Sequence, residues 1–343
     1  MRRPICLPRA GDPLLDIFSA GRAGPPGSIQ FTPAQVEQIM RTVRRTPEVM
    51  VKVTGGGIRR GAVAAHLSYI SRKGQLEIET DEGDRIDKKA QQGLLKDWHL
   101  ELSPGQYRKA KDGEPPPRPL KLTHNIVLSM PKPTPPDKVL AAAKAFAREK
   151  FALKHRYALV LHTHQEHPHV HLVVKAEGAD GRRLHIDKAM LREWREDFAR
   201  LMRAQGVAAN ATPRTVRGQS KRAERDAAYR TRRRGKSYAL RARVNSIAQE
   251  LATTRTIHDP AHKKLAETRK AVLAGWEGVA AALDAQGQIE LAGDVRYFAK
   301  HLPPVRTDRE RLAEDLLRHV EAVRASQSGR EDKERDRAIE RSR

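Results

Sequence analysis

Histidines are concentrated in one short stretch of the sequence, where their spacing suits metal binding. Five of the fourteen histidines fall within residues 162–171. Alternate side chains of a β-strand point to the same face, so His169 and His171 can reach one metal ion together. Such an ion would polarise a scissile phosphate and neutralise the charge that develops on it during cleavage.

A third ligand is predicted from the strand that precedes this pair. If Gln165 and Glu166 form a two-residue turn, residues whose numbers add up to 331 face each other across the hairpin. His162 then lies opposite His169, on the face that also carries His171. The three imidazoles of His162, His169 and His171 therefore converge.

The other two histidines of the stretch lie nearer the turn. The same pairing puts His164 opposite His167, where they would orient the inner ligands or bind DNA. Three neutral imidazoles with open positions suit Mn²⁺ or Zn²⁺, and Mg²⁺ is accepted where substrate oxygens complete the shell. The alternative is a solvated, histidine-rich hairpin without a metal. The density of histidines favours the metal site.

The surrounding sequence predicts an α+β fold, an antiparallel sheet with helices packed against it. Alternating or buried apolar runs predict strands over residues 49–54, 75–80 and 123–130, and two joined strands over residues 157–175. Helical spacing and capping signals predict helices over residues 33–46, 59–72, 88–101, 135–151 and 187–205. Thr134 is the expected cap of the helix at 135–151. The proline-rich residues 103–119 predict an exposed loop.

Beyond about Asn210 the strand patterns end and an α-helical C-terminal region is expected. Residues 214–243 hold twelve Lys or Arg against two acids, which favours a DNA-holding extension over a solvated helix face. Helices are predicted over 261–285 and 308–323, and the mixed-charge end predicts disorder or a lone helix. The predicted organisation is a leader with a short helix (1–46), an α+β domain that carries the histidine cluster (47–212) and the basic helical region (213–343).

Composition narrows the class of partner. The chain of 343 residues has 66 Lys and Arg against 42 Asp and Glu, a formal net charge of +24. Such an excess predicts a polyanion as partner, and the spread of the basic residues favours nucleic acid over a membrane surface. The single cysteine, Cys6, excludes an intramolecular disulfide and fits a reducing cytosol. Pro and Gly interrupt the N-terminal residues, which predict a flexible leader rather than a signal peptide.

Three segments resemble the motifs of the relaxase/mobilisation nucleases, which belong to the histidine-hydrophobe-histidine (HUH) endonuclease superfamily. They read VKVTGGGIRRGAVAAHLSYISRKGQLEIE, THNIVLSMP and YALVLHTHQEHPHVHLVVK. Their order and spacing carry the resemblance, which runs from about Val49 to Gly218. It implies an HUH-endonuclease-like, ferredoxin-like core and an enzyme that nicks one DNA strand at a plasmid transfer origin or T-DNA border.

The resemblance also implies roles for residues of this sequence. Tyr69 becomes the nucleophile, which forms a 5′-phosphotyrosine link and releases a 3′ hydroxyl. His162, His169 and His171 become ligands of a divalent ion, Mg²⁺ or Mn²⁺ with Zn²⁺ as a further choice. The expected location is the bacterial cytoplasm, with transfer of the protein together with the DNA into a recipient cell. The expected partners are single-stranded and transfer-origin DNA, accessory DNA-binding proteins and a type IV secretion coupling protein.

Two positions depart from the family pattern. His164 stands where the family has an aspartate, so it becomes a candidate for orienting His162 or accepting the tyrosine proton. Ser129 lies one residue later after His124 than expected. Neither Ser129 nor His124 receives a role from the resemblance.

Several basic residues near the first motif are candidates for DNA contact. Arg72 and Lys73 follow the tyrosine and suit backbone phosphates, or form an ordinary basic helix end. Arg59 and Arg60 are further candidates, whereas Gly55 to Gly57 favour a plain turn over a phosphate-binding loop.

Other readings of the same sequence remain. Tyr69 could be a core aromatic residue of an amphipathic helix. A rolling-circle replication initiator would share the metal site, although no helicase P-loop is found. A non-catalytic DNA-binding or metal-binding protein is the third alternative, and a nicking assay with phenylalanine at position 69 separates it from the enzymes.

Overall fold

The computed structural model describes residues 30–87, 89–100, 119–165, 167–220, 231, 234–254 and 256–341, with side chains up to residue 327. The predicted leader up to residue 29, most of the predicted loop at 103–119 and residues 221–230 of the basic stretch lie outside the described residues. The chain divides into two compact units, Glu37–Thr212 and a second unit of Met1–Val36 with Pro213–Arg343.

A six-stranded sheet forms the centre of the Glu37–Thr212 unit. Its strands are β1 (Met50–Gly55), β2 (Ile78–Thr80), β3 (Arg85–Ile86), β4 (Thr123–Ser129), β5 (Tyr157–His162) and β6 (His169–Lys175). They lie in the order β1-β4-β6-β5-β2-β3, and every neighbouring pair is antiparallel. The predicted α+β fold with an antiparallel sheet is thereby confirmed.

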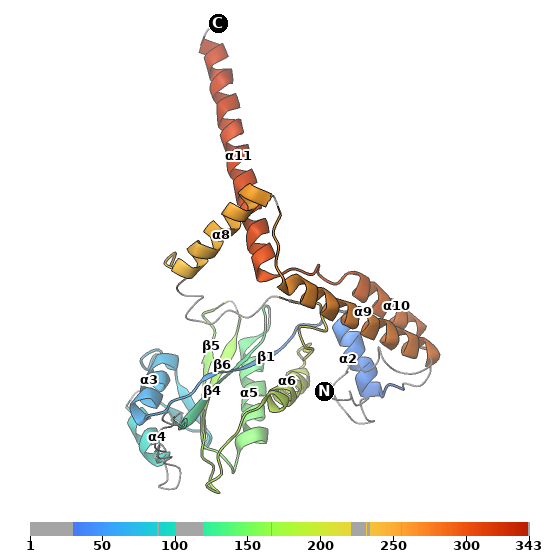
Figure 1. Ribbon diagram of the computed structural model, residues 1–343. Coiled ribbons are helices and arrows are strands. Elements are labelled where there is room, and N and C mark those ends of the chain that lie inside the picture. Colours follow the sequence, from blue (N-terminus) through green and yellow to red (C-terminus); the bar gives the residue numbers. More distant parts are fainter. Residues whose placement is uncertain are drawn as a thin grey trace, which may run out of the picture. The chain divides into compact units, whose positions relative to one another are not determined.

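Helices cover both faces of this sheet. They are α3 (Arg60–Ile70), α4 (Gln91–Asp97), α5 (Pro136–Phe151) and α6 (Lys188–Ala204). On one face α5 and α6 pack their apolar sides against the sheet, and Phe146, Trp194 and Phe198 form the centre of that core. On the other face α3 and α4 cover only part of the sheet, with Leu67, Trp98 and Val160 in a second core (Figure 1). The histidines of β5 and β6 lie on this second face, which also carries Val160.

The helix ends confirm one capping prediction, correct another and show a cap that was not predicted. At the start of α2 (Pro33–Val43), Thr32 and Gln35 exchange hydrogen bonds of 2.9 and 3.3 Å in the predicted capping box. The Asp187 carboxylate accepts the Met190 amide at 2.7 Å and caps α6. The predicted cap by Thr134 was wrong, because its hydroxyl donates to the Pro131 carbonyl instead and α5 begins without a side-chain cap.

Two element boundaries differ from the sequence prediction. The strand expected at 75–80 starts only at Ile78, because residues 71–76 form a tight turn in which the Leu76 amide donates to the Ser71 carbonyl at 2.9 Å. The helix expected at 88–101 spans only Gln91–Asp97 and ends before His99, whose φ of 43° is left-handed. The two-residue strand β3 pairs with β2 and was not predicted.

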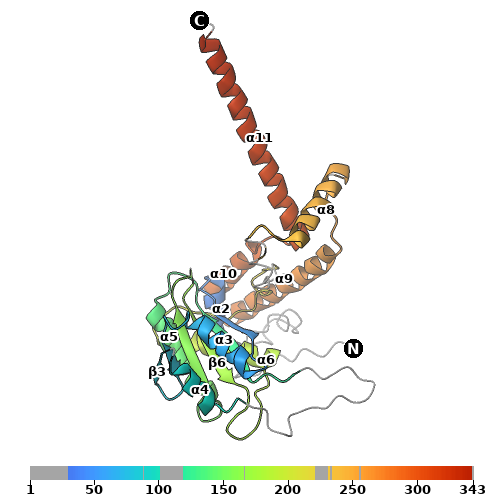
Figure 2. The ribbon, with the colours of Figure 1, turned by 90° about the vertical axis from the view of Figure 1, so that its left-hand side faces the viewer.

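The second unit is helical. Its helices are α8 (Tyr238–Thr254), α9 (Ala261–Ala285), α10 (Ile289–Lys300) and α11 (Asp308–Arg341). The bounds of α9 match the prediction, whereas α11 continues well past the predicted end at residue 323. Helices α9 and α10 lie side by side and pack Trp276 against Phe298 (Figure 1). Figure 2 shows α8 beside the first turns of α11, where Arg309 pairs with Glu250. None of the described helices is long and apolar enough to cross a membrane.

Candidate active site

The β5–β6 hairpin brings three histidines together near the connection between its two strands. The pairing has the predicted register, with His162 directly opposite His169. His171 lies two residues further along β6 and therefore on the same face. One ring nitrogen from each of His162, His169 and His171 lies within 4.8 Å of the other two. This spacing is compatible with three ligands around one ion.

The connection between the two strands is longer than the two-residue turn assumed from the sequence. The strands end at His162 and resume at His169, and Glu166 lies outside the described residues. His164 and His167 are exposed in this connection rather than paired as a rung of the ladder. The ring of His164 nevertheless lies with its centre 5.1 Å from that of His162.

Backbone carbonyls orient two of the three clustered rings. His162 donates from Nε2 to the Ile70 carbonyl at 2.5 Å, and His169 donates from Nδ1 to the His167 carbonyl at 2.9 Å. A carbonyl can only accept, so each bond fixes the protonated nitrogen of its ring. The other nitrogen then carries the lone pair that a metal ion requires.

Burial favours the neutral form of two of the clustered imidazoles. Burial lowers the pKa of His171 to about 3, and the positive charge that His162 and His169 would carry lowers it further. Burial also lowers the pKa of His162, despite its hydrogen bond to Ile70. Neutral imidazole is the metal-binding form, so these shifts favour binding of a cation.

Tyr69 lies on the exposed side of α3, one residue before the helix ends. Val63, Leu67 and Ile70 form the buried face of this helix, whereas the Tyr69 side chain is 61% exposed. The alternative of a core aromatic residue was therefore wrong. The carbonyl that accepts from His162 belongs to Ile70, the next residue in the chain, so the end of α3 is attached directly to the histidine cluster.

His66 is a site residue that the sequence reasoning missed. Its ring centre lies 6.5 Å from that of Tyr69 and 6.3 Å from that of His171. Burial lowers the pKa of His66, and its Nε2 is buried without a hydrogen-bond partner among the described residues. The available signal was its spacing, because residues three apart lie on the same side of a helix.

A strained turn follows α3 and carries the two basic residues of the first motif. Arg72 and Lys73 have φ angles of 53° and 59°, in the left-handed region that non-glycine residues rarely adopt. The charge of Arg72 lowers the pKa of both His162 and His164, so Arg72 lies close to the cluster. Arg59 and Arg60 lie at the start of α3 instead, roughly 14 Å from Tyr69 along the helix axis.

Buried hydrogen bonds hold this turn in place. The Ser71 hydroxyl is fully buried, donates to the Ser68 carbonyl at 3.3 Å and accepts the Gln91 side-chain amide at 2.9 Å. It also accepts the Gly74 amide at 3.3 Å. The first residue of α4 is therefore linked to the turn that follows the tyrosine helix.

The second motif places Ser129 near the cluster and His124 away from it. Ser129 pairs with His169 across β4 and β6, and its hydroxyl donates to the Pro168 carbonyl at 3.2 Å. His124 lies five residues earlier, so the alternation of the strand turns it to the opposite face. There it donates to the Leu184 carbonyl at 3.2 Å, and burial lowers its pKa to about 4.

The glycines before α3 have a packing role. A Cβ on Gly56 would lie 2.1 Å from the Thr123 carbonyl oxygen, and one on Gly57 would lie 2.4 Å from a Val63 methyl group. The Gly57 amide is also occupied, because it donates to the Thr123 hydroxyl at 3.1 Å. These contacts support the plain-turn reading of the glycine run.

Comparison with known proteins gives the site its context. The relaxase family described as "MobA/VirD2-like, nuclease domain" matches residues 107–207. This match includes the whole histidine cluster but not Tyr69. A T-DNA border endonuclease VirD2 of Agrobacterium fabrum is 25% identical over 219 residues, which cover 57% of this chain and 46% of the relative. The enzyme of the same name from Rhizobium rhizogenes is 28% identical over 142 residues, 37% of this chain and 30% of the relative.

The chain thus spans less than half the length of these relatives. A solved structure titled "Molecular Basis of Vancomycin Resistance Transfer in Staphylococcus aureus" aligns with 49% of this chain and 99% of its own, with 14% identity and a TM-score of 0.31. That similarity is too weak to support a structural argument. The family match and the distant relatives agree with each other, and residues 107–207 of this chain match the MobA/VirD2-like relaxase nuclease domain.

Proposed function

We propose that this protein is a relaxase that nicks one DNA strand at a transfer origin, with Tyr69 as its nucleophile. The observation that carries the proposal is the hydrogen bond from His162 to the Ile70 carbonyl. Through it, the end of α3, which carries the exposed Tyr69, is held at a fixed position relative to the histidine cluster. Covalent phosphoryl transfer depends on such fixed placement of the nucleophile and the groups that stabilise the phosphate.

The proposed reaction exchanges one phosphodiester bond for another. The Tyr69 phenol oxygen attacks the scissile phosphorus and gives up its proton. The bond from phosphorus to the 3′ oxygen breaks, and the released 3′ end takes up a proton to become a hydroxyl. The 5′ phosphate stays on the tyrosine, so the reverse reaction can rejoin the strand.

His162, His169 and His171 would hold the divalent ion that this chemistry uses. Their donor set of three neutral imidazoles fits Mn²⁺ or Zn²⁺, and Mg²⁺ where phosphate oxygens complete the shell. When bound, the ion supplies Lewis-acid stabilisation of the phosphate charge. His164 would orient His162 or accept the phenol proton, since it lies beside that ring in the position of the family aspartate.

Basic residues around the site would hold the DNA backbone. Arg72 is the best placed, because its charge reaches the histidine rings, and Lys73 follows it in the same turn. Arg59 and Arg60 would contact a more distant part of the strand. The relatives are named T-DNA border endonucleases, which supports DNA as the substrate and mobilisation of DNA as the biological role.

The test is a nicking assay on supercoiled plasmid that carries the origin of the same genetic element, with Mn²⁺ or Mg²⁺ present. The wild-type protein is expected to relax the plasmid and to remain attached to the 5′ end of the break. Tyr69→Phe should bind the same DNA and form no adduct. The matched control is Tyr297→Phe, because Tyr297 is similarly exposed (67%) but lies in the other unit. An adduct that persists in Tyr69→Phe rejects the assignment.

A further inference from the structure

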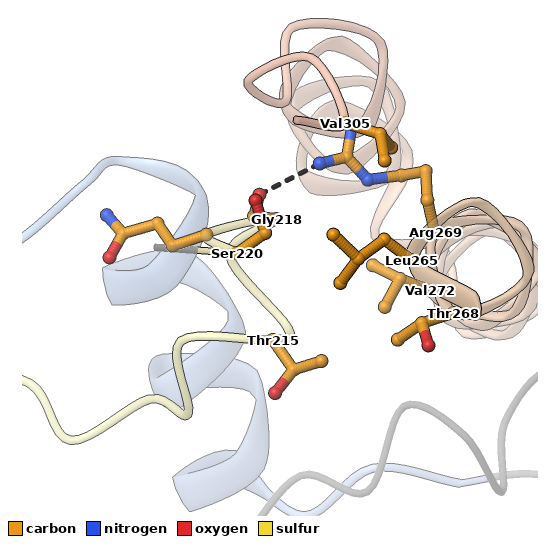
Figure 3. A pocket seen from close by; sticks show the side chains of 9 residues that line it. Thr215, Gly218, Ser220, Leu265, Thr268, Arg269, Val272 and Val305 are labelled. Carbon is orange, nitrogen blue, oxygen red and sulfur yellow. Dashed lines mark hydrogen bonds between the residues drawn. The ribbon is translucent and has the colours of Figure 1, made fainter. Parts of the chain in front are cut away.

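The helical unit contains a pocket with no part in the proposed nicking reaction. It has a volume of about 280 Å³ and lies between residues 215–220, one side of α9 and Val305 (Figure 3). Leu265, Val272 and Val305 give it an apolar wall. Its polar lining includes Thr215, Gln219 and Arg269 and contains no acidic residue.

Arg269 is the charged group of this pocket. Its guanidinium donates to the Gly218 carbonyl at 2.8 Å (Figure 3). A guanidinium has five N–H donors, so most of them remain available to a ligand. Burial lowers the pKa of Arg269, and no acidic group acts on it. No carboxylate among the described residues forms an ion pair with Arg269.

Three other arginines of the same unit form ion pairs with carboxylates. Arg306 pairs with Glu314, Arg309 with Glu250, and Arg311 with Asp308. The half-buried Arg269 is different, because its partner is a neutral carbonyl. A cation that is partly removed from water without a counter-charge costs free energy, which an anionic ligand would recover.

The backbone carbonyl of Gly218 fixes the position of the Arg269 guanidinium. Gly218 has a φ of 68°, and a Cβ there would lie 2.7 Å from an Arg269 side-chain nitrogen. Only glycine allows both this backbone conformation and this close approach. Because the Gly218 carbonyl already fixes the guanidinium, little side-chain entropy is lost when a ligand binds.

We propose that this pocket holds one nucleotide of single-stranded DNA, with its phosphate on Arg269 and its nucleoside against the apolar wall. A guanidinium suits phosphate because its N–H groups match the phosphate oxygens. The volume is just below the range of about 300–1,000 Å³ found for small-ligand sites, which fits a single nucleotide. This inference rests on the proposed function for the identity of the strand, since the +24 net charge alone specifies only a polyanion.

The test measures binding of fluorescent oligo-dT, which lacks the origin sequence, to the full-length protein at several salt concentrations. Arg269→Gln is expected to weaken binding about tenfold and to flatten the logarithmic salt slope by about 0.7, the value for one phosphate of a single strand. Lys270→Gln, an equal loss of charge at the next, exposed position, should change affinity less than about twofold. Thr268→Asp, which puts a carboxylate beside Arg269, should weaken binding as much as Arg269→Gln does.

Melting temperatures of the variants show whether each still folds, and thymidine 5′-monophosphate should compete with oligo-dT in the wild type but not in Arg269→Gln. Equal affinities for Arg269→Gln and Lys270→Gln would overturn the proposal. The proposal would also be overturned if labelled oligoglutamate bound through Arg269 and oligo-dT did not, because the ligand would then be an acidic peptide. If the protein binds oligo-dT through Arg269 but does not nick DNA, the proposed function is refuted, whereas the proposed nucleotide site in the pocket is supported.

Discussion

At the scale of single residues, the three clustered histidines combine burial with oriented rings. His162 and His169 each donate one ring proton to a backbone carbonyl, and burial lowers the pKa of His162 and His171. These features favour neutral rings with their lone pairs available. The cluster is therefore prepared for a cation before the cation arrives, which reduces the reorganisation that binding requires.

Removing any one of the three rings should weaken metal binding. His162→Ala, His169→Ala and His171→Ala are each expected to lower the affinity for Mn²⁺ at least about tenfold, because each removes one of three ligands. His167→Ala is the matched control, since it keeps the backbone carbonyl that contacts His169. Titration calorimetry measures the affinities. Tight binding in His162→Ala with loss of binding in His167→Ala would contradict this ligand set.

His124 should make stability depend on pH independently of the metal. Burial, followed by the charge of Lys121, lowers its pKa from 6.5 to about 4 in the folded protein. Below about pH 6.5 the unfolded chain binds a proton that the folded chain does not, so the free energy of unfolding falls as the pH drops towards 4. The expected loss is about 1 kcal/mol, because water screens this partly exposed ring.

The measurement is urea unfolding of the metal-free protein at about pH 7 and about pH 4.5. His124→Gln should show a smaller difference between the two conditions than the wild type. His185→Gln, which changes an exposed histidine of the same unit, should keep the wild-type difference. Identical pH dependence in the wild type and His124→Gln would refute the role of this ring.

At the scale of elements, the end of α3 and the turn after it form the link between the tyrosine and the cluster. Ile70 supplies a carbonyl to His162, and the next residue, Ser71, is the buried hydrogen-bonding centre of the turn. Left-handed conformations at Arg72 and Lys73 persist because these hydrogen bonds hold the backbone. Helix α4 contributes through Gln91, so it supports the site without lying in it.

Ser71→Ala should therefore lower stability and slow nicking. It leaves the buried Gln91 amide without its acceptor, which costs about 1–3 kcal/mol, and it loosens the turn that carries Arg72. We expect a lower kcat for nicking, with DNA affinity changed less than about threefold because Arg72 keeps its charge. Ser68→Ala, the same change one helical turn earlier, is the control. Equal kcat values for Ser71→Ala and the wild type would exclude this positioning role.

At the scale of the whole molecule, the charge exceeds what one active site needs. The net charge of +24 is distributed over the chain, and residues 214–243 form its densest basic stretch. Part of that stretch lies outside the described residues, and its role in holding DNA remains a prediction. Affinity and chemistry would then belong to different parts of the chain, because sequence-independent affinity comes mainly from phosphate neutralisation.

Removing charge from this stretch should weaken DNA binding without changing the chemistry. The variant replaces four described basic residues by glutamine: Arg234, Lys236, Arg241 and Arg243. Its logarithmic salt slope for single-stranded DNA should flatten by up to about 3, with nicking at saturating DNA unchanged. The control removes the same charge elsewhere, from Lys263, Lys264, Lys270 and Lys300. Matching slopes for the two variants would show that only net charge matters.

The sequence by itself determined the features that depend on neighbours in the chain. The register of β5 and β6 is local, because a short connection and the alternation of side chains leave few ways to pair His162 with His169. The predicted cap at Thr32 is also local, since it involves residues three apart. The helical spacing of α6 likewise indicated its buried face, with Trp194 and Phe198.

Only the tertiary structure decided which of these parts meet. In helix α3 the spacing of Leu67 and Ile70 indicated an apolar face, but this pattern could not tell whether Tyr69 also faces the core. The bond between His162 and Ile70 joins residues 92 apart, and the bond between Arg269 and Gly218 joins residues 51 apart. Such contacts depend on how whole faces pack, and local periodicity specifies that a face is apolar but not which partner covers it.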